Sequence, residues 1–184
     1  MKTRNFLRRP LYLFLYLLLL SCSSGNKEQK EIVDASKQLE RDLEMYEYVW
    51  TTYVQGDTSV MSEKYFTKDV VVVTADGDLI GLEACREYYA NYLSGFSEVE
   101  WNIIDAFGQG DKLVKHWNFK GKHTGNFFGI EPTGNYLDLS GTTIVTLRDG
   151  KIAKEHDFFD MKSMIDQLAK SDGDVTIDEY QPVE

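Results

Sequence analysis

The chain has 184 residues, with thirty acidic side chains, twenty basic ones and a formal net charge of −10. This length is typical of one domain built around a single core. The negative charge argues against nucleic acid as a partner and against electrostatic adhesion to anionic lipid.

Residues 1–21 have the organisation of a bacterial signal peptide. Four basic residues lie within 1–9, and 11–20 is an apolar run half as long as the roughly 20 residues of a spanning helix. The next residues, Leu19-Leu20-Ser21-Cys22, resemble the lipobox of bacterial lipoproteins. The resemblance implies cleavage before Cys22 and lipidation of Cys22. An ordinary secretory signal and an uncleaved anchor are the alternatives.

Lipidation implies a place in the cell envelope. Ser23 stands where an Asp holds proteobacterial lipoproteins at the inner membrane, so we expect the outer membrane or the cell surface. Removal of 1–21 leaves 163 residues and sixteen basic side chains, a charge of −14, so the lipid has to provide membrane attachment. Cys85 is then the one remaining thiol, which excludes a disulfide within the mature chain. Its place on an apolar helical stripe indicates packing.

In chain order, residues 22–31 are the lipidated cysteine and a polar tether. Apolar residues at helical spacing then predict an aromatic-rich helix from Ile32 that ends at Gly56-Asp57. Thr58 or Ser59 is expected to cap a short helix to about Tyr65. Residues 70–74 and 79–81 read as a hairpin around Asp76-Gly77. A third helix is expected to place Leu82, Cys85, Tyr89, Tyr92 or Leu93, and Phe96 on one side.

The second half reads as antiparallel sheet. Strands are expected at 99–107, 112–123, 136–147 and 151–159, with tight turns at 108–111 and 148–150. Asp160 is placed to cap a helix over 161–169 with Met164, Ile165 and Leu168 inward. Residues 171–184 form an acidic tail. The order predicts an α+β fold, with helices on the concave face of a curved antiparallel sheet and an aromatic-lined cavity between them.

This order resembles the nuclear transport factor 2-like cone, and residues 115–168 carry a closer resemblance. Gly121-Lys-His123-Thr-Gly125, Gly129-Ile-Glu-Pro-Thr-Gly134, Asp149-Gly-Lys-Ile152 and Asp157-Phe-Phe-Asp160 are similar to motifs of the SnoaL-like polyketide cyclase family. We therefore expect a SnoaL-like domain over 32–170. The glycines and the Pro132-Thr-Gly134 turn are interpreted as structural, because they suit tight turns and close packing.

The resemblance implies that Asp157 is a general acid and base beside a carbonyl, which requires apolar surroundings for its carboxylate. The resulting enolate needs a partner, for which the sequence offers His116, His123 and Asn118. His116 and Asn118 share a strand face, whereas His156 and Asp157 point to opposite faces. His156 stands where relatives usually carry an aromatic residue. The expected pocket-lining set comprises Tyr46, Trp50, Tyr53, Tyr89, Trp101, Asn118 and Phe159.

Two functional classes follow. One is a cofactor-free cyclase, isomerase or hydrolase that acts on a small apolar carbonyl compound with Asp157, His123 and His116. The other is a non-catalytic lipoprotein that binds an apolar molecule or has a structural role in the envelope. No pattern of metal ligands, phosphate-binding loop or nucleotide fingerprint occurs, so neither class is expected to need a metal or a cofactor. The resembled fold often pairs through the outer sheet face, which leads us to expect a homodimer.

Overall fold

The computed structural model describes residues 9–75 and 77–169, with side chains from residue 27 onward. Two compact units are present, Met1–Arg41 and Asp42–Glu184. The described part of the first unit belongs to helix α1 (Arg9–Val54), which continues into the second unit. In the portion of the chain that was described, no helix has the length and apolarity needed to cross a membrane.

Helix α1 starts earlier than the sequence indicated. The expected tether over 23–31 lies within it, because this stretch contains strong helix formers and an i,i+4 ion pair between Lys27 and Glu31. Ile32, expected on the buried stripe, is 64% exposed. Residues 1–8 and the side chain of Cys22 lie outside the described residues, as do 170–184 and Asp76.

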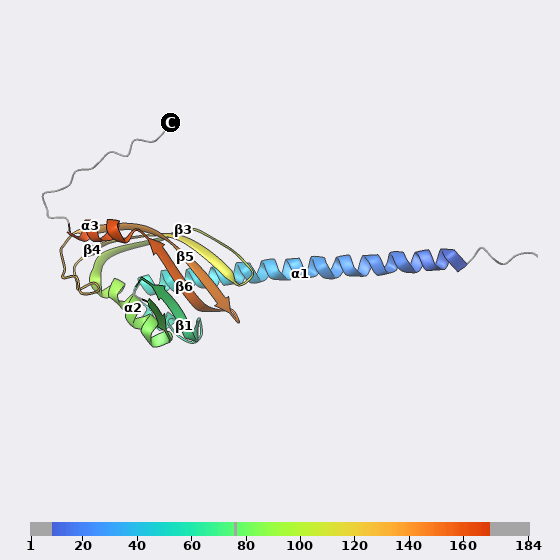
Figure 1. Ribbon diagram of the computed structural model, residues 1–184, viewed down its shortest axis with the longest axis horizontal. Coiled ribbons are helices and arrows are strands. Elements are labelled where there is room, and N and C mark those ends of the chain that lie inside the picture. Colours follow the sequence, from blue (N-terminus) through green and yellow to red (C-terminus); the bar gives the residue numbers. More distant parts are fainter. Residues whose placement is uncertain (1–8, 76, 170–184) are drawn as a thin grey trace, which may run out of the picture. The chain divides into compact units, whose positions relative to one another are not determined.

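The second unit contains one six-stranded sheet and the remaining helices (Figure 1). Its strands are β1 (Phe66–Thr74), β2 (Gly77–Ile80), β3 (Phe96–Gln109), β4 (Lys112–His123), β5 (Tyr136–Arg148) and β6 (Lys151–Phe159), in the spatial order β2-β1-β6-β5-β4-β3. The helices are α2 (Leu82–Gly95) and α3 (Met161–Ala169). The predicted α+β class is thus confirmed, and the four long strands lie where alternation placed them.

The sheet is mixed rather than antiparallel. Strand β1 runs parallel to β6, with Val73 opposite His156, whereas all other neighbours are antiparallel. The sequence gives no local signal for this pairing, because β1 and β6 are joined through the rest of the domain. Curvature has a local cause in β3, where the register with β4 shifts twice and Glu98 adopts a φ of 55°. Such bulges bend a strand.

Two smaller expectations were wrong. In place of a second α-helix to Tyr65 there is a single 3₁₀ turn, Thr58–Val60, where the Asp57 side chain accepts a hydrogen bond from Ser59 N. Helix α3 has the predicted bounds and the Asp160 cap to Ser163 N, but Ile165 is 41% exposed. Met164 and Leu168 already fill the contact with the core, so Ile165 lies at its margin.

One face of the sheet carries the core. Along β4, Leu113, Trp117 and Phe119 are buried, and Lys115 is buried between them at the same period. The end of α1 and helix α2 supply Tyr46, Trp50 and Tyr89 to the same interior. Cys85 is fully buried in α2, which confirms its packing role. The fold therefore places two helices over an inner sheet face that includes charged side chains.

Candidate active site

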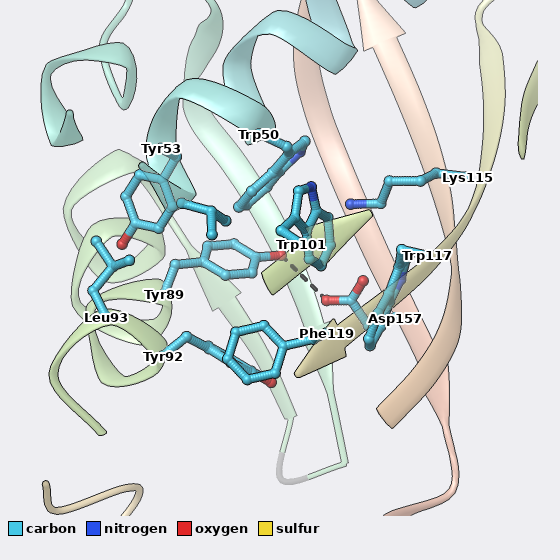
Figure 2. Close-up of a pocket in the computed structure, with 11 residues that line it drawn as sticks. Trp50, Tyr53, Tyr89, Tyr92, Leu93, Trp101, Lys115, Trp117, Phe119 and Asp157 are labelled. Atoms are coloured by element: carbon cyan, nitrogen blue, oxygen red, sulfur yellow. Dashed lines mark hydrogen bonds between the residues drawn. The ribbon is translucent and has the colours of Figure 1, made fainter. Parts of the chain in front are cut away.

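The interior of the second unit holds a small cavity between α1, α2 and the inner face of the sheet (Figure 2). Its volume is about 50 Å³, room for a few water-sized groups. Aromatic and apolar side chains form most of the wall, and Lys115 and Asp157 are its charged members. The full lining consists of Trp50, Tyr53, Val54, Tyr89, Tyr92, Leu93, Trp101, Lys115, Trp117, Phe119 and Asp157.

Asp157 is held by hydrogen bonds on both carboxylate oxygens. Thr143 on the adjacent strand β5 lies opposite it in register and donates to Oδ1 at 2.5 Å. Trp117 Nε1 donates in turn to Thr143 Oγ1 at 2.9 Å, which orients the threonine hydroxyl toward the acid. Tyr89 of α2 donates to Asp157 Oδ2 at 3.3 Å. The carboxylate therefore has a fixed orientation at the cavity wall, as a positioned acid–base group requires.

A second carboxylate, Glu155, lies two residues earlier on the same face of β6 and is fully buried. Tyr46 donates to Oε1 at 2.5 Å and Trp50 Nε1 donates to it at 3.2 Å. The Tyr89 hydroxyl lies 3.2 Å from Oε2, so this one phenol contacts both acids. Burial raises the pKa of Glu155 to about 7, and the charge of Asp157 adds to the rise, against the opposing effect of Lys115.

Lys115 of β4 supplies the positive charge. Its Nζ lies 4.7 Å from the ring centroid of Trp50, 4.8 Å from that of Trp101 and 5.1 Å from that of Tyr46. Contacts of this kind stabilise an ammonium through the ring quadrupole. Burial lowers the pKa of Lys115, while the charges of Glu155 and Asp157 counteract the effect. Among the described residues no ion pair includes Lys115.

A wider groove adjoins the cavity, with a volume of about 620 Å³. Asp157 and Tyr92 line both spaces. The other walls come from β1, β2, α2, the segment before β5, the end of β6 and α3. They are Val73, Thr74, Ala75, Leu79, Tyr88, Phe127, Phe128, Ile130, His156, Phe158, Phe159, Met161, Met164 and Ile165. The arrangement is a narrow cavity that holds a carboxylate and an amine among aromatic side chains, beside a broad and mostly apolar groove.

Comparison with known proteins identifies the family. Residues 42–168 match the family model of the SnoaL-like polyketide cyclases. The chain belongs to this family. The match begins at Asp42, where the second compact unit begins. No curated protein sequence matches the chain.

Solved structures agree on the fold. A protein from Jannaschia sp. CCS1 that is described as a SnoaL-like polyketide cyclase is 20% identical, with a TM-score of 0.67 over 72% of this chain and 94% of that one. IdmH from Streptomyces antibioticus, described as a polyketide cyclase, is 19% identical, with a TM-score of 0.59 over 70% and 99%. TerC, co-crystallized with polyporic acid, is 17% identical, with a TM-score of 0.58 over 71% and 99%.

The SnoaL-like fold brings together several of the residues expected at the site. Trp50, Tyr53, Tyr89, Trp101 and Asp157 line the inner cavity. Tyr46 lies behind it, bonded to Glu155, and Phe159 lines the groove. The apolar surroundings expected around Asp157 are present as well.

The expected partners of Asp157 lie elsewhere. His116 is exposed on the outer sheet face, and Asn118 shares that face and donates to Asp138 and Ser140. Side chains alternate between the two faces of a strand, and Trp117 points inward, so His116 and Asn118 on either side of it point outward. His123 points inward but lines neither space, because Phe96 and Phe127 cover its ring. These three residues are therefore not part of the cavity, and this part of the expectation is corrected.

His123 has a structural role instead. Its Nδ1 accepts a hydrogen bond from Thr133 N at 3.3 Å, and its carbonyl accepts one from Gly134 N at 2.9 Å. Burial lowers the pKa of the imidazole, which favours its neutral form. At Gly125 a Cβ would lie 2.0 Å from the Ser94 carbonyl oxygen, so the backbone packs too closely for any other residue. The motif at 121–125 is thus hydrogen-bonded to the motif at 129–134, which confirms the structural interpretation of the glycines and the turn.

Sequence reasoning missed Lys115 and Glu155. Neither was considered as a site residue, because a charged side chain on a strand usually faces solvent. The signal that could have identified them is their register: Lys115 falls between Leu113 and Trp117 at period two, and Glu155 falls two residues before Asp157. Charged residues at two inward positions of one sheet are costly unless paired or functional.

Proposed function

We propose that the domain catalyses cofactor-free acid–base chemistry on a small apolar carbonyl compound. The observation that carries this proposal is the shared cavity of Asp157 and Lys115. The acid is fixed by Thr143 and Tyr89, and the ammonium is surrounded by aromatic rings. A fixed carboxylate supplies the base, and the ammonium supplies a charge for the oxygen on which electrons accumulate.

In the proposed reaction the substrate carbonyl oxygen points to Lys115 and an adjacent C–H points to Asp157. Asp157 takes the proton, the C–H electron pair forms the enolate, and the Lys115 ammonium stabilises the negative oxygen. Attack of the enolate carbon on a second carbonyl of the same substrate closes a ring. The resulting alkoxide then recovers the proton from Asp157. In a substrate with a β,γ double bond the enolate is a dienolate, and return of the proton from Asp157 to the γ carbon gives the conjugated isomer instead.

Surrounding groups support these two residues. Burial raises the pKa of Tyr89 well above 10, so its phenol remains a hydrogen-bond donor to the acids. Trp101 stacks on Trp117, with ring centroids 5.5 Å apart, and the pair forms a flat wall for an apolar substrate. A bound apolar substrate would displace water from this cavity, which would strengthen the electrostatic effect of Lys115.

Deuterium exchange tests the proposal without knowledge of the natural substrate. The protein is incubated with 2-hexanone in D₂O, and NMR follows loss of the C–H signals beside the carbonyl. We expect exchange above the buffer rate, reduced about 100-fold or more by Asp157→Asn. Asp105→Asn is the matched control, because Asp105 is exposed on β3 and lines neither space. Equal rates in the two variants would refute the assignment of Asp157.

A non-catalytic binding role is the second candidate. Both oxygens of Asp157 already accept hydrogen bonds, an arrangement that also suits a fixed anchor for a ligand hydroxyl. Native mass spectrometry of the purified protein distinguishes the two: a binder retains one apolar ligand unchanged, whereas an enzyme converts or releases it.

We also propose that the protein is a lipoprotein, attached through Cys22 to the cell envelope, at the outer membrane or the cell surface. The basis is the ordered series of basic residues, apolar run and Leu19-Leu20-Ser21-Cys22. Two or more acyl chains provide stable attachment where one does not. The compact SnoaL-like unit would then be held at a membrane surface, near apolar compounds.

A further inference from the structure

The inner cavity and the groove differ greatly in size. About 50 Å³ is enough for a carbonyl and its nearest atoms, whereas ligand sites usually measure about 300–1,000 Å³. The groove, at about 620 Å³, falls in that range. Because Asp157 and Tyr92 line both spaces, a ligand with its carbonyl in the inner cavity beside Asp157 can place the rest of its length in the groove.

The topology explains why the groove exists. Strand β1 accompanies β6 only as far as the pair Val73 and His156, whereas β6 continues to Phe159 beside β5. Over the described residues no strand therefore covers that edge of β6 from Asp157 onward. Side chains on both faces of the strand end are open to the same space. The chain then turns into α3, which forms the opposite wall.

The groove is also the site of incompletely buried apolar side chains. Phe128, Phe158, Met161 and Ile165 line it and are 41–47% exposed. They come from three separate segments: the loop before β5, the end of β6 and helix α3. Clustered apolar exposure of this kind marks a binding groove more often than isolated exposed residues do.

We infer that the substrate is an elongated apolar carbonyl compound, with its chain in the groove and its carbonyl end in the inner cavity beside Asp157. This inference rests on the proposed function for the place of the carbonyl, and it adds the class of substrate. A compact ligand in the inner cavity would leave the groove empty, and a ligand held in the groove alone would not reach Lys115, which lines only the inner cavity.

A homologous series of ligands tests the inference. Dissociation constants are measured for 2-hexanone to 2-dodecanone through the fluorescence of the cavity tryptophans. Burial of each methylene should tighten binding by about threefold to fourfold until the groove is filled. Ile165→Ser should weaken binding of 2-dodecanone about tenfold and leave 2-hexanone unchanged. Ile104→Ser is the control, because Ile104 is similarly exposed, at 56%, and lines neither space.

The outcomes separate this inference from the proposed function. Dissociation constants that do not change with chain length overturn it, as does a failure of every ketone to bind, or equal weakening by both isoleucine variants. A chain-length trend in a protein that shows no deuterium exchange supports the groove and removes the catalytic proposal. Deuterium exchange without a chain-length trend supports the catalytic proposal and removes the groove as the binding site of the substrate chain.

Discussion

Replacement of Glu155 by Gln should change how the stability of the protein depends on pH. Burial holds the folded-state pKa of Glu155 at about 7, above its usual value of 4.5. The folded state therefore binds more protons than the unfolded state between these values. Its free energy of unfolding falls as pH rises through that window. The free-energy cost of burying the ionised Glu155 carboxylate is absent below pH 4.5 and complete above pH 7.

The size of the effect follows from the pKa difference. At about 1.4 kcal/mol for each pH unit, the displacement from 4.5 to about 7 corresponds to about 3 kcal/mol. Glutamine removes the ionisation but keeps an oxygen that accepts from Tyr46 and Trp50. Glu155→Gln should thus gain about 3 kcal/mol relative to the natural chain between about pH 4 and pH 8. Burial lowers the pKa of Lys115, so the contribution of Lys115 to the free energy of unfolding rises with pH, and it does so in a more alkaline range than that of Glu155.

Urea unfolding at several pH values measures this difference. Glu87→Gln is the control, since Glu87 is exposed on α2 and should give a curve parallel to that of the natural chain. Parallel curves for Glu155→Gln as well would refute the reasoning, because Glu155 would then ionise in the folded state as readily as in the unfolded state. If the stability advantage of Glu155→Gln over the natural chain became smaller as pH rises, the predicted direction of the pKa shift would be contradicted.

Three further predictions concern other parts of the molecule. Cys22→Ser should abolish incorporation of a radiolabelled fatty acid and alter processing; unchanged labelling would exclude lipidation at Cys22. Gly125→Ala should lower the free energy of unfolding in urea by about 3 kcal/mol, because its Cβ would meet the Ser94 carbonyl oxygen. Gly110→Ala, which has open space around its Cβ and a φ of 60°, should lower it by about 1 kcal/mol, and equal losses would contradict the packing argument. The protein should sediment as a homodimer at tens of micromolar and Ile144→Lys, on the outer sheet face, should give monomer; a monomeric natural chain would contradict this.

Local patterns predicted most of the elements. Strands β4, β5 and β6 and helix α3 occupy nearly the predicted residues, because alternation, glycine turns and the Asp160 cap are all local signals. The parallel pairing of β1 with β6 has no such signal. It depends on how α2 and the long strands bring distant segments together.

The site was only partly accessible from the sequence. The family resemblance directed attention to Asp157, and helical spacing indicated Trp50 and Tyr89, all of which line the cavity. The choice of His116 and His123 as partners relied on residue type alone. Strand register decides the matter, since it turns His116 outward and brings Lys115 and Glu155 inward. An inward charge on a β-strand deserves more weight than a histidine of unknown facing.

The most direct test of the central claim compares binding and exchange in one variant, Asp157→Asn. The asparagine keeps the size and one acceptor oxygen of the side chain but cannot take a proton. We predict that the variant binds 2-dodecanone within about threefold of the natural affinity while deuterium exchange beside the carbonyl falls about 100-fold or more. Undiminished exchange in a variant that still binds the ketone would contradict the account.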